Sequence, residues 1–327
     1  LDTSFYDLLA SESRLASLWA IAKADVPVAH WSALGRPYFS DGSRAGLRSW
    51  SGSMFEYLMP TLLLDEPHGS ALARAGQTAL RAQIDFGHER GVPWGISESA
   101  YAASDHTLAY QYAPQGVPRL ALRRTPADEL VIAPYATALA ALVAPAAAVD
   151  NLRRLQALHA RDSAGFIEAL DYTRERQAGK APNMRVATFM AHHQGMTIVA
   201  LADALLDAAP RRWAMAEPRL QAVASLLQER VPREVSLLVE PPPAPGTGDR
   251  RHSLPGLWRK IVPGTAALEP THLLSNGHYS VALRANGAGW SRFGQEFVTR
   301  WRDDALRDAY GSFFYLRRAP QDAPVSL

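Results

Sequence analysis

Residues 241–248 read PPPAPGTG, and this stretch divides the chain into two parts of different character. Proline fixes φ and lacks a backbone N–H, so the stretch can neither extend a helix nor lie within a sheet. We therefore expect a linker over residues 241–260. Residues 1–240 are rich in Ala and Leu at helical spacing, whereas residues 261–327 have the alternation and turn dipeptides of β structure.

About seven helices are expected before the linker. The first runs from a cap at Ser4 to about Lys23 and has Glu12 in its middle. A second over residues 51–64 contains Glu56 and should bend or end at Pro60. The others are expected near residues 69–90, 134–143, 145–160, 186–207 and 212–230. Long aromatic and polar loops, at residues 30–50 and 91–130, exceed the usual connection length and are where function is often located.

The tail from about residue 270 is β-rich. Tyr279, Val281 and Leu283 alternate with polar residues, and Asn276-Gly277 is a turn dipeptide. Three to five strands would leave sheet edges and an apolar face uncovered, so we expect an incomplete β-sandwich. The sequence therefore indicates a piece of a longer polypeptide.

Composition excludes several classes of function. The 34 Lys and Arg residues nearly balance the 32 Asp and Glu residues, for a net charge of +2, so no strong field is available to bind nucleic acid. The absence of cysteine excludes disulfides, thiolate zinc sites and a cysteine nucleophile. No apolar run approaches the ~18–20 residues of a membrane-spanning helix, so we expect a soluble chain.

Carboxylates within aromatic and glycine-rich sequence are the main candidates for chemistry. Cleavage of a glycosidic bond needs one protonated and one ionised carboxyl group, and aromatic surroundings suit both sugar rings and a raised carboxyl pKa. Glu98 lies in VPWGISESAY, Glu56 follows WSGSMF, and Glu12 lies in ASESR. Simpler interpretations are a short helix capped by Ser97 around Glu98, and plain surface charge for Glu12.

Two adjacent histidines form a further candidate group. His192 and His193 would diverge by about 100° on a helix, so a metal site is not expected. One imidazole could bind a ligand hydroxyl while the other satisfies the core, and Gln194 adds a donor and an acceptor. We expect neither a metal nor another cofactor.

The segment GFIEALDYT adds two more carboxylates. Asp171 could hold a sugar hydroxyl, although helix capping explains Glu168 and Asp171 equally well. Tyr110 and Tyr112 could stack on sugar rings or could be half-buried loop residues.

Five motifs occur in order along the helical part. They are DTSFYDLLASE at 2–12, WSGSMFEYLMP at 50–60, GVPWGISESAY at 91–101, GFIEALDYT at 165–173 and MAHHQGM at 190–196. Together they resemble the glucoamylase-like central domain of bacterial cyclic β-1,2-glucan synthases. The resemblance covers about residues 1–235. The tail from Pro270 to Phe314 resembles the start of the β-sandwich that opens the phosphorylase-like region of the same synthases.

This resemblance implies a mainly α fold. Residues 1–240 would be part of an (α/α)6 toroid of the six-hairpin glycosidase type, truncated at its N-terminus because about seven helices are counted where the family has twelve. Residues 261–327 would begin a galactose-mutarotase-like β-sandwich. The implied partners are β-1,2-glucan chains, an upstream membrane glycosyltransferase and a downstream phosphorylase-like domain. The implied location is the cytoplasmic side of the bacterial inner membrane.

The resemblance also implies retaining transglycosylation that closes glucan rings. Glu98 would be the nucleophile and Glu12 the general acid/base, with Glu56 as the second candidate for the acid. The implied glucan-binding residues are Trp50, Trp94, Tyr101, Tyr110, Glu168, Asp171, His192, His193 and Gln194. Two alternatives stay open, namely an inverting β-1,2-glucan hydrolase and a non-catalytic glucan-binding module.

Overall fold

The structure is a computed structural model, and it describes residues 7–41, 44–104, 110–124, 126, 128–177, 181–237, 271–284, 288–299, 315–317 and 325–326. The chain divides into two units, residues 1–105 with 110–252 and residues 106–109 with 253–327. The expected linker at 241–260 lies outside the described residues.

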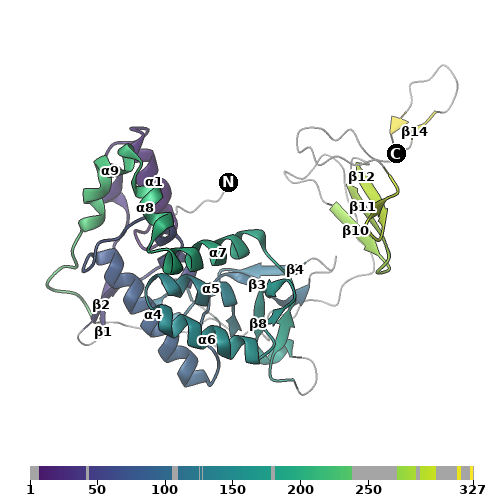
Figure 1. Cartoon of the computed structure of the whole chain (residues 1–327), viewed down its shortest axis with the longest axis horizontal. Helices are drawn as coiled ribbons and strands as arrows, with labels where there is room; N and C mark the ends of the chain where they lie inside the picture. The colour runs from purple at the N-terminus through teal and green to yellow at the C-terminus, as the bar shows by residue number, and fades with distance from the viewer. Residues whose placement is uncertain are drawn as a thin grey trace. The chain divides into compact units, whose positions relative to one another are not determined.

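The first unit is mostly helical (Figure 1). Its α-helices are α1 (Ser13–Ala22), α2 (Ala29–Ala33), α3 (Met54–Leu58), α4 (Ala71–Arg90), α5 (Pro134–Leu139), α6 (Pro145–Ala157), α7 (Ala191–Leu205), α8 (Ala209–Met215) and α9 (Pro218–Val223). Single 3-10 turns are η1 (Pro60–Leu62), η2 (Pro118–Leu120), η3 (Ala140–Leu142), η4 (Arg174–Arg176) and η5 (Ala224–Gln228). Of the described helices, none is both long and apolar enough to cross a membrane.

Helix was found in every stretch expected to contain it, but the boundaries differ. α3 ends just before Pro60, as expected, and the chain continues as η1. The stretch 212–230 is broken at Pro218, whose ring favours the first turn of a new helix, α9. The short α2 lies in the 30–50 segment that we expected to be a loop.

The expectation that Glu12 lies in mid-helix is wrong, because α1 begins only at Ser13. Leu8 forms a parallel bridge with Gly35, and the Leu9 N–H donates to the Gly35 carbonyl at 2.9 Å. The Ser11 hydroxyl then bonds back to the Leu8 carbonyl at 2.7 Å. These contacts hold the preceding residues out of the helix, so Glu12 becomes the N-cap of α1.

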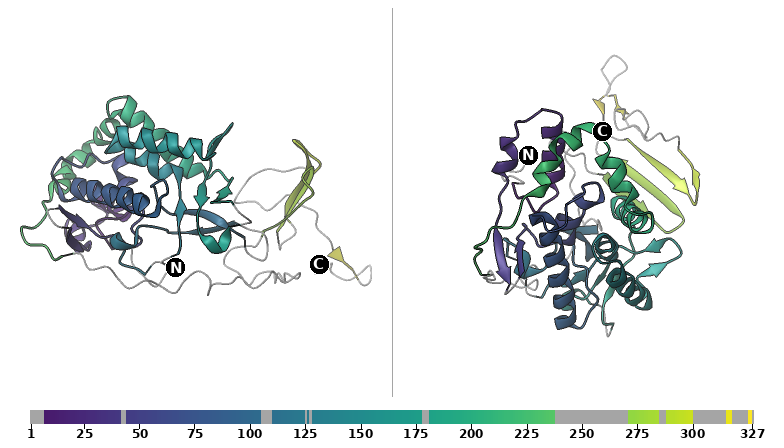
Figure 2. Two further views of the ribbon diagram at one scale, coloured as in Figure 1. Left: turned by 90° about the horizontal axis from the view of Figure 1, so that it is seen from below. Right: turned by 60° about the vertical axis from the view of Figure 1, so that its left-hand side comes forward.

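The core of this unit surrounds α5, every residue of which is buried. Most side chains of its PYATAL sequence are small, so α3, α6 and α7 pack directly against it. Figure 2 shows the helices of this unit from two further sides. The long α4 starts at the Ser70 N-cap, which accepts from the Ala73 N–H, and ends at Gly91 in the left-handed conformation (φ 68°).

Short strands lie beside these helices and position the site. β3 (Ser99–Ser104) pairs with β4 (Tyr110–Ala113), inside the segment that we expected to be a long loop. β8 (Ala169–Asp171) lies between β5 (Val131–Ile132) and β9 (Met184–Val186). The first unit also contains the hairpins β1 (Tyr38–Asp41) with β2 (Arg44–Leu47) and β6 (Arg161–Asp162) with β7 (Gly165–Phe166). A second small core of Ala100, Val131, Ala169 and Val186 joins β3 to the three-stranded sheet.

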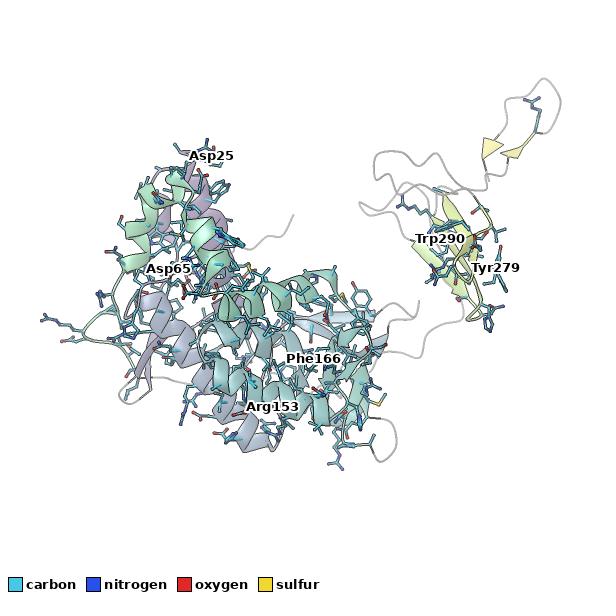
Figure 3. All side chains as sticks on the ribbon, in the orientation of Figure 1. Asp25, Asp65, Arg153, Phe166, Tyr279 and Trp290 are labelled. Carbon is cyan, nitrogen blue, oxygen red and sulfur yellow. The ribbon has the colours of Figure 1, made fainter. Side chains whose placement is uncertain are left out.

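The second unit contains an antiparallel meander of four strands. They are β10 (Thr271–Ser275), β11 (Tyr279–Arg284), β12 (Gly289–Phe293) and β13 (Glu296–Phe297); β14 (Tyr315–Leu316) pairs with β15 (Val325–Ser326). Figure 3 labels Tyr279 and Trp290 on this sheet. The expected β character is thus confirmed, but the buried residue of β11 is Ala282, and Leu283 on the expected apolar face is 39% exposed.

Candidate active site

Buried amide side chains hold the segment that leads to Glu98. Gln83 on α4 accepts from the Ile96 N–H and donates to the Ile96 carbonyl, both at 2.7 Å. Asn151 on α6 donates to the Trp94 carbonyl at 2.8 Å. The segment runs directly into β3 with no helix around Glu98, so the interpretation of Ser97 as a helix cap is wrong. The backbone at Glu98 is therefore fixed by the helical core.

Glu98 is one end of a chain of four hydrogen-bonded side chains. The Tyr112 hydroxyl lies 2.8 Å from Glu98 Oε1 and 3.3 Å from His193 Nε2. His193 Nδ1 lies 2.9 Å from Glu168 Oε2, and Glu168 Oε1 accepts from the Ala100 N–H at 3.0 Å. The four residues come from the position just before β3, from β4, from α7 and from the turn before β8, so only the folded chain brings them together.

Aromatic rings fix the imidazole in this chain. The Tyr135 ring stacks on His193 with centroids 3.7 Å apart and planes within 8°. Its hydroxyl lies 2.8 Å from Ser97 Oγ and 2.9 Å from the Glu98 carbonyl oxygen. His193 is only 1% exposed, whereas the neighbouring His192 ring, which meets it edge-on at 4.1 Å, is exposed.

The surroundings of Glu98 act on the pKa of its carboxyl group in opposite directions. Burial raises the pKa of Glu98, while the hydrogen bond from Tyr112 and the charge of a protonated His193 lower it. The carboxylates of Glu56 and Glu168 raise the pKa further. Burial, followed by the charge of Glu98, also raises the pKa of Tyr112, so this hydroxyl keeps its proton at neutral pH.

Glu12 shares this electrostatic neighbourhood. Burial is the main cause that raises the pKa of Glu12; its own backbone hydrogen bond lowers it, and the charges of Glu56 and Glu98 raise it. Arg14 lowers it slightly. A carboxyl group that keeps its proton to higher pH is suited to general-acid catalysis.

Arg14 locks the start of α1 against α3. The side chain is 1% exposed and its guanidinium donates to four groups. They are the carbonyl oxygens of Ser11 (3.0 Å), Glu56 (2.8 Å) and Tyr57 (2.6 Å) and the carboxylate of Glu66 (2.9 Å). Because three partners are backbone atoms, Arg14 holds the Glu12 backbone in place relative to α3.

Glu56 is enclosed by hydrogen-bond donors. Its Oε2 accepts from the Ser49 hydroxyl (2.9 Å), the Ser53 N–H (3.0 Å) and the Ser53 hydroxyl (3.0 Å), and also from the Ser51 hydroxyl. Its Oε1 accepts from the Ser51 N–H at 3.1 Å. With Ser53 it completes a capping box at the start of α3. Both oxygens thus serve the local backbone.

The other residues expected to bind glucan differ in how far they are exposed to solvent. Trp50, Tyr110 and His192 are exposed, and a ligand could reach them. Trp94 is 6% exposed and belongs to the main core. Gln194 is half-buried and donates to the carbonyl of Phe166, which Figure 3 labels.

Asp171 and Tyr101 lie in a polar cluster between β3 and β8. Asp171 is fully buried and accepts from the N–H groups of Ala102 and Thr173, both at 2.9 Å. Arg176 donates to it at 2.6 Å and lies over the Tyr101 ring at 4.6 Å. Asp171 therefore ties β3 to β8 and η4.

Several residues of the site were not proposed from the sequence. Tyr112 was noted only beside Tyr110 as a stacking candidate, and period-two alternation could have placed both on one face of a strand. Tyr135, Arg14 and Arg176 form no local motif, since each has at least one partner far away in the sequence: Ser97 for Tyr135, Glu56 for Arg14 and Tyr101 for Arg176. No motif signal would have found them.

An apolar groove of about 660 Å³ opens beside Glu12. Trp19 from α1 and Trp213 from α8 line it, as do Met59 and Glu217. Trp19 is 40% exposed and Trp213 is 71% exposed, so both rings are available to a ligand. Within the described part of the chain, no cluster of three or more His, Asp or Glu side chains is arranged to hold a metal ion.

Residues 4–208 match the family described as putative glucoamylase, and residues 261–327 match the supersandwich domain of glycosyl hydrolase family 94. The chain is 44% identical over 319 residues to the cyclic β-(1,2)-glucan synthase NdvB of Rhizobium meliloti. This alignment covers 97% of the chain but only 11% of the synthase, so the chain spans about one ninth of that relative's length.

Two solved structures are also similar to this chain. A putative glucoamylase from Bacteroides caccae superposes with a TM-score of 0.51 at 17% identity, over 67% of this chain and 54% of its own. A β-1,2-glucanase from Parabacteroides distasonis gives a TM-score of 0.43 at 17% identity, over 67% of this chain and 30% of its own. The first of these likenesses supports a glucoamylase-like fold for the helical unit.

Proposed function

This chain belongs to the putative glucoamylase family, and from that premise we propose that it is a section of a cyclic β-1,2-glucan synthase that rearranges glucan chains by retaining transglycosylation. The sequence identity to such a synthase supports the parent enzyme. The observation that carries the chemistry is the half-buried Glu98 carboxylate, held by Tyr112 and electrostatically coupled to Glu12.

In the proposed reaction Glu98 attacks the anomeric carbon and forms a glycosyl ester. Glu12 gives its proton to the departing glycosidic oxygen. A hydroxyl of an incoming glucan end then loses its proton to Glu12 and attacks the same carbon, and the bond to Glu98 breaks. An attack from within the same chain closes a ring. This route needs the two carboxyl groups roughly 5–5.5 Å apart in the working enzyme.

The hydrogen bonds favour this division of roles. Tyr112 donates to Glu98, which stabilises the ionised form that a nucleophile needs. Glu12 receives its largest pKa effect from burial, which stabilises the protonated form. We assign Glu56 to positioning, because its oxygens are occupied by the serine cluster.

The accessible residues supply the proposed glucan-binding surface. Trp50, Tyr110 and His192 would contact sugar units near Glu98, and Trp19 with Trp213 would stack on units in the groove beside Glu12. The buried residues Trp94, Glu168, Asp171 and His193, with the half-buried Tyr101 and Gln194, would support the site from behind. The chain would then act on β-1,2-glucan.

For the parent enzyme we propose the architecture that the family implies. Residues 1–240 would form part of an (α/α)6 toroid and residues 261–327 would begin a β-sandwich, joined by the linker at 241–260. A membrane glycosyltransferase upstream, on the cytoplasmic side of the inner membrane, would supply linear glucan, and a phosphorylase-like domain would follow.

Mass spectrometry of products from linear β-1,2-glucan tests this proposal. The chain and its Glu98→Gln variant are incubated separately with the glucan. We expect cyclic or length-redistributed glucans from the unsubstituted chain and none from the Glu98→Gln variant. Shortened linear products would instead support an inverting hydrolase. An unchanged glucan that still binds would support a non-catalytic binding module and overturn the proposal.

A further inference from the structure

The Tyr112 hydroxyl lies between two groups that can both accept a hydrogen bond. It is 2.8 Å from Glu98 Oε1 and 3.3 Å from His193 Nε2. Beyond the imidazole, Nδ1 faces Glu168 at 2.9 Å, and Glu168 also accepts from the Ala100 N–H. An ionised Glu168 therefore orients Nδ1–H toward itself, which leaves Nε2 facing Tyr112.

Counting protons shows that this arrangement is one proton short. Tyr112 has a single proton, whereas an ionised Glu98 and a neutral His193 would both need to receive it. One of the two contacts would then hold two lone pairs facing each other, which is unfavourable because the His193 imidazole is only 1% exposed. One additional proton satisfies every contact.

We propose that the chain holds this additional proton and that Tyr112 passes it between Glu98 and His193. In one arrangement Glu98 donates to the Tyr112 oxygen, and Tyr112 donates to a neutral His193. In the other, a protonated His193 donates to the Tyr112 oxygen, and Tyr112 donates to an ionised Glu98. The change moves two protons by one hydrogen bond each, transfers no electrons, and leaves the summed charge of the four residues unchanged.

The surroundings make both arrangements accessible. Glu168 has no exposed side-chain surface and supplies the negative charge that stabilises a protonated His193. Tyr135 covers one face of the His193 imidazole and His192 meets its edge, so water is kept from the His193 ring on these two sides. The negative charges of Glu56 and Glu168 in turn raise the pKa of Glu98, which favours its protonated form.

This proton exchange would serve the catalysis proposed above, and the role rests on that proposed function. Glu98 must be ionised when it attacks the anomeric carbon. Transfer of its proton to His193 ionises it without release of a proton to water. Tyr112 touches the reacting carboxylate, whereas His193 and Glu168 act through Tyr112 as positioning residues.

Nuclear magnetic resonance on the whole chain can locate the proton. Histidine labelled with ¹⁵N reports the protonation of His193, and glutamate labelled at ¹³Cδ reports that of Glu98. The signals are assigned by their loss in the His193→Gln and Glu98→Gln variants. Between pH 6 and 8 we expect one member of the pair to be protonated and the other not. An ionised Glu98 beside a neutral His193, or protonation of both, would overturn the proposal.

Two substitutions on β4 test whether Tyr112 makes the link. Tyr112→Phe removes the hydroxyl, and we expect the ¹³C signal of Glu98 and the ¹⁵N signal of His193 then to change independently of each other with pH. The matched control Tyr110→Phe, on the same strand but 56% exposed, should leave both signals as in the parent chain. A pair that still shares one proton in Tyr112→Phe would overturn the role of Tyr112.

The measurement needs no turnover, so it is independent of the proposed function. A shared proton in a chain that forms no transfer products would refute the transglycosylase and leave the proton link intact. Transfer products from a chain in which Glu98 and His193 share no proton would refute the proton link and leave the transglycosylase intact. Kinetically, Tyr112→Phe should lower kcat about 100-fold, within the range for loss of one acid–base contribution, with little change in KM.

Discussion

We expect replacement of Glu56 to destabilise the folded site, and not only to stop the reaction. Two backbone N–H groups, those of Ser51 and Ser53, donate to its carboxylate and cannot turn toward another partner. In Glu56→Gln these charge-assisted bonds become neutral ones, a loss of about 1 kcal/mol each or about 2 kcal/mol in all. Glu56→Ala leaves both buried N–H groups unpaired, which we expect to cost about 4 kcal/mol.

Thermal unfolding followed by helical circular dichroism measures the effect. For a unit of this size, about 2–4 °C accompanies each kcal/mol, so the midpoint should fall by roughly 4–8 °C for Glu56→Gln and about twice that for Glu56→Ala. Glu98→Gln is the matched control, because Glu98 is half-buried and its oxygen contacts a tyrosine hydroxyl rather than backbone donors. A Glu56→Gln variant that unfolds like the parent chain but has lost all activity would refute the structural role and restore Glu56 as the acid.

Three further predictions concern Glu12, Asp171 and Trp213. The pKa of Glu12 is raised in the folded chain, so Glu12 contributes its full stability below a pH of about 4.5, and this stability is lost as the pH rises through the folded-state pKa. Glu12→Gln should therefore raise the midpoint of thermal unfolding by about 2–4 °C at pH 7 but not at pH 4. An equal change at both pH values would contradict this. Asp171→Asn weakens three charge-assisted hydrogen bonds to the carboxylate, from Arg176 and from the Ala102 and Thr173 N–H groups, and should destabilise the chain by about 3 kcal/mol; KM for glucan should not change, because Asp171 is fully buried. Trp213→Ala should weaken glucan binding about tenfold in calorimetry, whereas Leu205→Ala, exposed on α7 outside the groove, should not; equal affinities would exclude the groove as a sugar site.

The sequence identifies candidate carboxylates but not their surroundings. Glu98, Glu12 and Glu56 are candidates because each lies in a short segment of unusual composition, which is local information. The side chain that hydrogen-bonds to Glu98 is Tyr112, and it lies beside Glu98 only because β3 pairs with β4 within a segment that has no strong strand signal. Asp171 and Trp94 were expected to bind glucan, yet both are buried, because burial depends on contacts from distant elements.

The sequence by itself determined the mainly helical first part, the β-rich tail, the proline-rich stretch between them and the family, because periodicity, turn residues and ordered motifs are properties of contiguous residues. Only the tertiary structure decided that Glu12 is an N-cap, that Glu56 serves a serine cluster and that Glu168 reaches Glu98 through His193 and Tyr112. The serines around Glu56 are near it in the sequence, but Tyr112 bonds to Glu98 and to His193, which are 14 and 81 positions away. Such pairs meet only when packing of the apolar core closes the chain over them, and no local pattern encodes that closure.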